Sequence, residues 1–181
     1  MASIIKANQL QDFGGNSIIT SDGSGTITLS SGMNTAVAAG TNNTPAFHVY
    51  NPQNGSVAND TSVVVSNNTE LLDSSAAYDT STYKFTPQVA GYYFLYANVR
   101  YQSGTTDFDR INLRITKNGS AALHARNNNK DYSTVCVSGT VQANGSSDYF
   151  QMTSYQNSGG SISITTAAEL TYFGGYKLIG A

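Results

Sequence analysis

Residues 85–101 carry apolar side chains on both faces of an extended stretch. Their sequence is FTPQVAGYYFLYANVRY, in which a turn at Ala90-Gly91 precedes aromatic and branched residues that favour a pleated, buried surface. Because successive side chains of a strand point to opposite faces, alternate residues fall into two sets. One set is Tyr93, Leu95, Ala97, Val99 and Tyr101, and the other begins with Tyr92, Phe94 and Tyr96.

The second face of this predicted strand needs a cover. An antiparallel strand of a monomeric sandwich usually has one face in water, but here the second face becomes polar only at Asn98 and Arg100. The first face can fill the core of a sandwich. A neighbouring subunit is the simplest way to cover the second face, so the pattern predicts an oligomer. The closing stretch ELTYFGGYKLI, residues 169–179, is two-faced in the same way.

The rest of the chain after residue 44 has the pattern of short strands and tight turns. No run has a period of 3.6 residues, so no helix is predicted. Turn signals such as Lys117-Asn118-Gly119 and Asn144-Gly145 separate the strands. We expect further strands at residues 46–51, 63–65, 83–86, 111–115, 121–125, 133–141, 149–155, 162–164 and 169–179. This set predicts an all-β sandwich or barrel.

The first 44 residues differ from the rest and predict an extended N-terminal segment of β and coil structure. They are rich in Gly, Ser, Thr and Asn. Residues 17–29 predict a hairpin that turns at Asp22-Gly23, and residues 32–44 predict a linker. Such a segment is too small to bury its own core, so it is either a flexible tail or orders against a partner. The predicted domains are residues 1–44 and 45–181.

The composition contains few charges. Charged residues make up 11% of the chain, against roughly 25% in ordinary soluble domains. The net charge of −2 gives no electrostatic basis for binding nucleic acid or anionic lipid. No stretch approaches the ~20 apolar residues of a membrane-spanning helix, and the first residues lack the apolar run of a signal peptide. We therefore expect no nucleic-acid partner, no membrane insertion and no secretion signal.

The residue types that most often carry catalysis are sparse. Cys136 is the only cysteine, stands in an apolar stretch, and is expected to be a small buried side chain. His48 and His124 have no Cys, His or carboxylate at metal-ligand spacing, so both are expected to be structural or surface residues. The sequence contains no nucleophile elbow and no phosphate-binding loop. It therefore predicts a protein that is not an enzyme and has no cofactor.

Four short motifs follow one another along the main domain. Pro45-Ala46-Phe47 opens it, and Tyr78-Asp79 comes a few residues before the run from Tyr83 to Pro87, YKFTP. Ala90-Gly91-Tyr92-Tyr93-Phe94 begins the central strand, and Tyr172 to Leu178, YFGGYKL, closes the chain. In this order the motifs resemble the globular head domain of the first complement component, the C-one-q type. The resemblance covers about three quarters of the chain.

The resemblance implies a ten-stranded jelly-roll sandwich of the tumour-necrosis-factor-like (TNF-like) kind. It also implies a compact homotrimer with aromatic residues near the threefold axis, which agrees with the two-faced central strand. The residues expected at the trimer interface are Tyr92, Phe94, Tyr96, Tyr172 and Phe173.

The resemblance also raises calcium as a possible ligand, because loop carboxylates in that family can hold calcium near the trimer apex. Asp107, Asp109 and Asp131 lie in predicted loops, and the first two are two positions apart. Calcium takes about six or more oxygen ligands, and this spacing is not a calcium-loop motif. Solvated loops are the favoured interpretation. The three arginines of this region are expected to be ion-pair or rim residues rather than an anion site: Arg110, Arg114 and Arg126.

The N-terminal segment departs from the animal members of that family. It contains no collagen repeat, and residues 3–32 resemble N-terminal segments of tailed-bacteriophage virion proteins, especially tail fibres. The implied protein is a virion component: a trimeric tail-fibre or tip head that attaches to other virion proteins through this segment. The implied head contacts a host surface glycan or protein. A capsid decoration protein that stabilises the shell and a free carbohydrate-binding lectin are the alternatives.

If the head binds a receptor, loops at one end of the jelly roll are the expected surface. Asn127, Asn128 and Tyr132 are the candidates for receptor contact. An aromatic ring can stack on a sugar, and an amide can hydrogen-bond to sugar hydroxyls. Ordinary polar loops remain the alternative for each of these residues.

Overall fold

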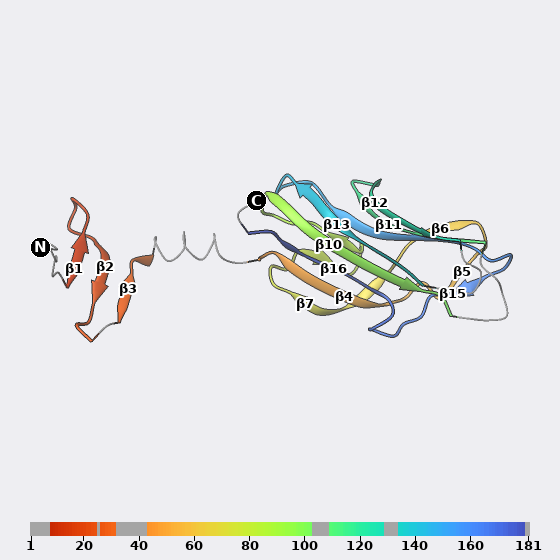
Figure 1. Cartoon of the computed structure of the whole chain (residues 1–181), viewed down its shortest axis with the longest axis horizontal. Helices are drawn as coiled ribbons and strands as arrows, with labels where there is room; N and C mark the ends of the chain where they lie inside the picture. Colours follow the sequence, from red (N-terminus) through yellow and green to blue (C-terminus); the bar gives the residue numbers. More distant parts are fainter. Residues whose placement is uncertain (1–7, 25, 32–42, 103–108, 129–133, 180–181) are drawn as a thin grey trace, which may run out of the picture. The chain divides into compact units, whose positions relative to one another are not determined.

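A computed structural model describes residues 8–24, 26–31, 43–102, 109–128 and 134–179. The chain divides into two compact units, residues 1–42 and 43–179 (Figure 1). Every named element within the described residues is a β-strand. No helix among these residues is long and apolar enough to cross a membrane.

The N-terminal unit contains a small antiparallel sheet with the order β1-β2-β3. Its strands are β1 (Gln9–Gln11), β2 (Ser17–Ser21) and β3 (Ile27–Leu29). The predicted hairpin is confirmed, since β2 pairs with β3 and Asp22 accepts a hydrogen bond from the backbone N–H of Ser24 at 2.8 Å. The sequence did not predict β1. Leu10, Phe13 and Ile27 stay exposed.

The second unit, called the head below, is built from two large antiparallel sheets. The five-stranded sheet has the order β13-β10-β16-β4-β7. Its strands are β4 (Ala46–Pro52), β7 (Asn67–Asp73), β10 (Gly91–Arg100), β13 (Thr134–Ala143) and β16 (Tyr172–Lys177).

The six-stranded sheet has the order β12-β11-β14-β9-β8, and β6 also pairs with β14. Its strands are β6 (Thr61–Val64), β8 (Tyr78–Asp79), β9 (Lys84–Phe85), β11 (Arg110–Lys117), β12 (Ser120–Asn127) and β14 (Phe150–Asn157). A separate pair joins β5 (Ser56–Val57) to β15 (Ile162–Ser163). Two sheets with one core between them are the predicted sandwich.

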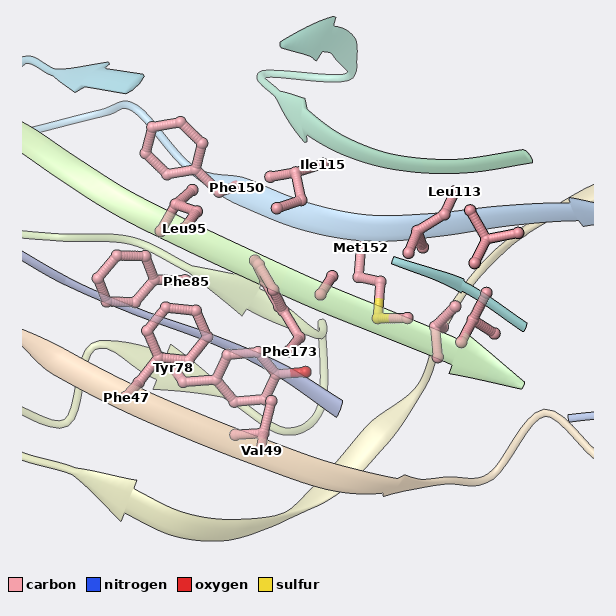
Figure 2. Close-up of a cluster of buried hydrophobic side chains, with 14 of the residues drawn as sticks. Phe47, Val49, Tyr78, Phe85, Leu95, Leu113, Ile115, Phe150, Met152 and Phe173 are labelled. Carbon is pink, nitrogen blue, oxygen red and sulfur yellow. The ribbon is translucent and has the colours of Figure 1, made fainter. Parts of the chain in front are cut away.

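The core lies between the inner faces of the two sheets. The inward set predicted for the central strand is confirmed, because each member is at most 2% exposed: Tyr93, Leu95, Ala97, Val99 and Tyr101. The six-stranded sheet contributes Ile111, Leu113, Ile115, Phe150 and Met152. Figure 2 shows the aromatic part of this core, where the rings of Phe47 and Phe85 stack with centroids 4.0 Å apart.

The structure corrects two predictions about side-chain direction. Phe173 is completely buried, and its ring meets the edge of Phe47 at 4.8 Å in the core, so it cannot belong to an outward-facing interface. The reason is register, because Phe173 lies opposite the inward-facing Ala97. Cys136 is exposed rather than buried, because it lies opposite Asn98 on the outer face of the five-stranded sheet.

The local sequence accounts for the turn after β11 and for the irregular pairing of β7. The predicted hairpin after β11 is confirmed: Asn118 and Gly119 have φ angles of 52° and 82°, as a tight two-residue turn requires. β7 is a seven-residue strand that is missing from the strands expected from the sequence. A bulge opposite His48 and Val49 interrupts its pairing with β4, which breaks the alternation that identifies a strand in sequence.

Candidate subunit interface on the five-stranded sheet

A layer of rings covers the face of the five-stranded sheet that points away from the core. We call this surface the aromatic face. Its side chains come from β4, β10 and β16, three adjacent strands of the sheet (Figure 1). Its members are His48, Tyr92, Phe94, Tyr96, Tyr172 and Tyr176.

Five of the six rings, all but Tyr92, form a continuous chain of contacts, in which Phe94 and Tyr96 are the central pair with centroids 6.5 Å apart. Phe94 and Tyr176 lie opposite each other in register, with centroids 5.8 Å apart. Tyr96 contacts Tyr172 at 6.1 Å, and Tyr172 stacks on His48 at 5.4 Å. These separations fall in the range in which aromatic pairs attract each other. The layer is therefore ordered within a single chain.

Gly174 sets the height of this layer above the sheet. It lies opposite Tyr96 on one neighbouring strand and opposite His48 on the other. A Cβ added at Gly174 would come within 2.5 Å of the Tyr96 ring. Because Gly174 has no side chain, the Tyr96 ring can pack directly on the backbone of β16. In this position the Tyr96 hydroxyl reaches Nδ1 of His48 at 3.0 Å.

Burial favours the uncharged forms of two members of this face, His48 and Tyr96. It lowers the pKa of His48 from its usual 6.5, so the neutral imidazole is favoured. Burial is also the main cause of the raised pKa of Tyr96, with smaller contributions from Tyr172 and Tyr176. An uncharged ring layer is easier to remove from water than a charged one.

The rings are nevertheless incompletely covered by their own chain. Tyr92 is 43% exposed, and Phe94, Tyr96, Tyr172 and Tyr176 are half-buried. At the β7 edge, Leu72 lies opposite His48 and is 48% exposed. On the other side, β13 presents small polar side chains, among them Ser138 and Thr140. A contiguous apolar patch with a polar rim is typical of a protein interaction surface.

The structure brings four of the five predicted interface residues onto this face, and Phe173 is the exception. His48 and Tyr176 also belong to it, although the sequence analysis did not select them. For His48 the missed signal was its position between the inward-facing Phe47 and Val49. For Tyr176 the only signal was its distance of four residues from Tyr172, which places both side chains on the same face of a strand. Both signals become clear once the inward face of each strand is known.

Of the three receptor-loop candidates, the structure describes only Asn127 and Asn128. Asp107, Asp131 and Tyr132 lie outside the described residues. Asn127 pairs with Ile111 and donates from Nδ2 to the backbone oxygen of Thr134 at 3.3 Å. Asn128 is exposed and accepts a hydrogen bond from Nε of Arg126 at 2.6 Å. The receptor prediction for these loops stays a prediction.

Calcium binding likewise stays a prediction. Asp109 is exposed just before β11, and its backbone N–H donates to the oxygen of Asn157 at 2.9 Å. Within the described part of the chain, no three His, Cys, Asp or Glu side chains gather closely enough to hold a metal ion. Two of the three predicted carboxylates fall outside that part.

Sequence comparison finds no relative for this chain: no family profile matches it, and neither does any curated protein. Comparison of structures does find similar folds. Murine APRIL at pH 5.0 matches with a TM-score of 0.57 and 15% identity, over 74% of this chain and 98% of the other. The TNF protein Eiger from S. frugiperda matches with a TM-score of 0.54 and 12% identity, over 75% and 93%.

The globular domain of the zebrafish complement 1qA protein matches with a TM-score of 0.50 and 19% identity, over 74% of this chain and 97% of the other. At these identities the likeness concerns the fold. Together with the two packed antiparallel sheets, it shows that the head is a jelly-roll sandwich of the kind shared by TNF-like proteins and C-one-q globular heads.

Proposed function

We propose that this chain is a non-enzymatic structural protein whose head assembles as a homotrimer through the aromatic face. The observation that carries the proposal is the ordered ring layer that its own chain leaves partly uncovered. A closed cyclic assembly covers such a face on every subunit and leaves no sticky surface. The threefold choice is supported by the fold, because the family that the sequence resembles forms compact trimers with aromatic residues near the axis.

The N-terminal unit supports a role as an anchor. Its three-stranded sheet leaves Leu10, Phe13 and Ile27 exposed, so these side chains are available to fill grooves on another protein. Three copies held together by a trimeric head would bind as one multivalent unit, and modest contacts per chain would suffice. Its resemblance to tailed-phage virion proteins supports a tail fibre or tail tip as the setting, with the head contacting the host surface.

The role on the particle is tested by locating the protein and by competing with it. Electron microscopy of particles labelled with an antibody to the head should place it at the tail. Purified head should also reduce adsorption of intact particles to host cells, because it occupies the same receptor.

Two other outcomes would contradict the tail proposal. Label spread over the capsid, with fragile particles when the protein is absent, would identify a decoration protein. Absence of the protein from particles, with retained sugar binding, would identify a free lectin.

A further inference from the structure

A second surface of the head carries positive charge. It is the outer face of the six-stranded sheet over β11 and β12, which lie side by side (Figure 1). In β11 the odd-numbered Ile111, Leu113 and Ile115 are buried in the core, so the even-numbered side chains point outward. We call this surface the arginine face. Its members are Arg110, Asn112, Arg114, His124 and Arg126.

Strand register brings these side chains together. Arg114 lies opposite His124, and Asn112 lies opposite Arg126. Side chains directly opposite in an antiparallel pair have Cβ atoms about 4.5–5.5 Å apart. On the other side of β11, Thr153 and Tyr155 of β14 lie opposite Arg114 and Asn112. The result is a patch of cations bordered by hydroxyl groups.

Among the described residues, no carboxylate forms an ion pair with a member of this patch. Lys117–Asp148 is the one ion pair between described residues, and it lies outside the patch. Arg114 makes no hydrogen bond or ion pair with any described residue. The pKa of His124 is lowered, first by burial and then by the positive charges of Arg114 and Arg126. Of the two roles expected for these arginines, ion-pair or rim residue, Arg114 does not have the first within the described residues.

Arg110 differs from the other arginines, because internal contacts hold it in place. Its Nη2 donates to the hydroxyl of Tyr155 at 2.6 Å, and its guanidinium lies 4.7 Å from the centre of that ring. The Tyr155 hydroxyl in turn donates to Asp60. Arg110 therefore forms a fixed border of the patch, whereas Arg114 is open to a ligand.

The centre of the patch holds an unsatisfied polar group. Asn112 is only 7% exposed, and its Oδ1 has no hydrogen-bond partner among the described residues. Buried polar atoms usually have a partner, because leaving one unpaired is costly. A lone acceptor among cations suits a ligand that carries both a hydroxyl donor and a negative group.

We propose that the arginine face is a binding site for an acidic glycan. Arg114 and Arg126 hold a carboxylate or sulfate group by charge-assisted hydrogen bonds, and Asn112 Oδ1 accepts from a neighbouring sugar hydroxyl. Thr153 offers a further hydroxyl contact. The inference rests on the proposed function, since it names the chemistry of the host surface that the head would contact.

The test measures binding of the full-length protein to defined polymers by titration calorimetry. Heparin supplies sulfate, polygalacturonate supplies carboxylate, dextran is the neutral control, and single-stranded DNA is the phosphate control. We expect binding to heparin or to polygalacturonate that weakens as salt rises, and none to dextran. The preferred polymer identifies the anionic group. DNA binding as tight as that of the preferred glycan would overturn the proposal.

Single substitutions locate the site. Arg114→Gln and Arg126→Gln should each weaken binding roughly tenfold or more, because each removes a charge-assisted hydrogen bond. Asn112→Asp, which keeps the size of the side chain, should abolish binding by placing a carboxylate between the arginines. Lys177→Gln is the matched control, since it removes one charge from the other sheet, and it should bind within about twofold of wild type.

Wild-type affinity in both arginine variants, or an equal loss in Lys177→Gln, would overturn the proposal. Light scattering on every sample separates this result from the proposed function. A trimer that binds no glycan contradicts only the glycan site. A monomer that binds glycan contradicts only the trimer.

Discussion

At the scale of single residues, Gly174 is the position at which the backbone directly shapes the aromatic face. A methyl group there would overlap the Tyr96 ring, so the ring must rise from the sheet and lose its packing on β16. This role differs from that of glycines in phosphate-binding loops, where the missing side chain lets the backbone approach a ligand. Here the glycine accommodates a neighbouring side chain.

Gly174→Ala should therefore destabilise the head by about 1–3 kcal/mol, as overpacking usually does. Denaturant unfolding measures the change. Gly160→Ala is the matched control, because no atom lies within 4 Å of the added methyl group, and it should be near neutral. Equal stability of the two variants would show that Tyr96 does not depend on Gly174.

His48 gives the aromatic face a pH dependence. Its pKa in the folded protein lies below the usual 6.5, because burial disfavours the imidazolium. Below pH 6.5 the unfolded chain therefore binds more protons than the folded chain. The contribution of His48 to stability is constant above this pH and falls as the pH drops toward the folded pKa.

The melting temperature should accordingly fall between pH 7.5 and pH 5, and His48→Phe should reduce that fall. The pKa of His124 is also lowered, so only the difference between wild type and His48→Phe is informative. His124→Gln serves as the companion variant. An unchanged slope in His48→Phe would contradict a buried neutral imidazole at this position.

At the scale of elements, alternation in the sequence was enough to orient β10 and β11. In β11 the inward residues are apolar and most outward ones are polar. In β10 only the outward face becomes polar, at Asn98 and Arg100, so the other face is the one that can fill the core. β16 could not be oriented in this way, because Tyr172 and Phe173 are both aromatic. Its pairing with β10, which puts Phe173 beside Ala97, decides the question, and that is a long-range contact.

The outward direction of Cys136 could have been predicted from the alternation of residues in β13, which the sequence analysis did not use. Thr134, Ser138 and Thr140 share its parity in β13, and all are exposed, whereas the buried Val135 belongs to the other set. The polar neighbours at even positions indicate an outward Cys136. The prediction considered only the small size and low polarity of the thiol, and it therefore placed Cys136 in the core.

We predict that the head folds and trimerises without the N-terminal unit. Deleting residues 1–43 should leave a soluble trimer with unchanged thermal stability, because the head begins at Pro45, whose oxygen accepts from the backbone N–H of Lys177 at 3.1 Å. The truncated protein should be absent from assembled particles. Calorimetry and immunoblots of purified particles measure the two effects.

Unfolding or monomerisation of the truncated chain would instead make this unit part of the trimer. Normal incorporation into particles would contradict the anchor. Deletion of residues 1–7 alone is a milder control, since it leaves β1, β2 and β3 in place.

At the scale of the whole molecule, the sequence predicted a sandwich and a surface in need of a cover. It could not predict the arginine face. The spacing of Arg110, Asn112 and Arg114 indicates that they share one side of a strand, but the pairing with β12 that adds Arg126 is set by the fold. Nor does sequence reveal which charges find a partner in space.

The central claim is that the aromatic face joins three chains. Size-exclusion chromatography with light scattering, at micromolar concentration, tests it most directly on the full chain and on Phe94→Asp. Phe94 is half-buried in the single chain, so the variant should fold. A carboxylate buried in a subunit contact costs several kcal/mol or more, so it should not assemble.

The account predicts three times the chain mass of 19.1 kDa for the wild type and a single chain mass for Phe94→Asp. Val89→Asp, which changes a loop side chain that is 44% exposed, should remain a trimer. A monomeric wild-type protein, or a Phe94→Asp variant that is still trimeric, would contradict the claim.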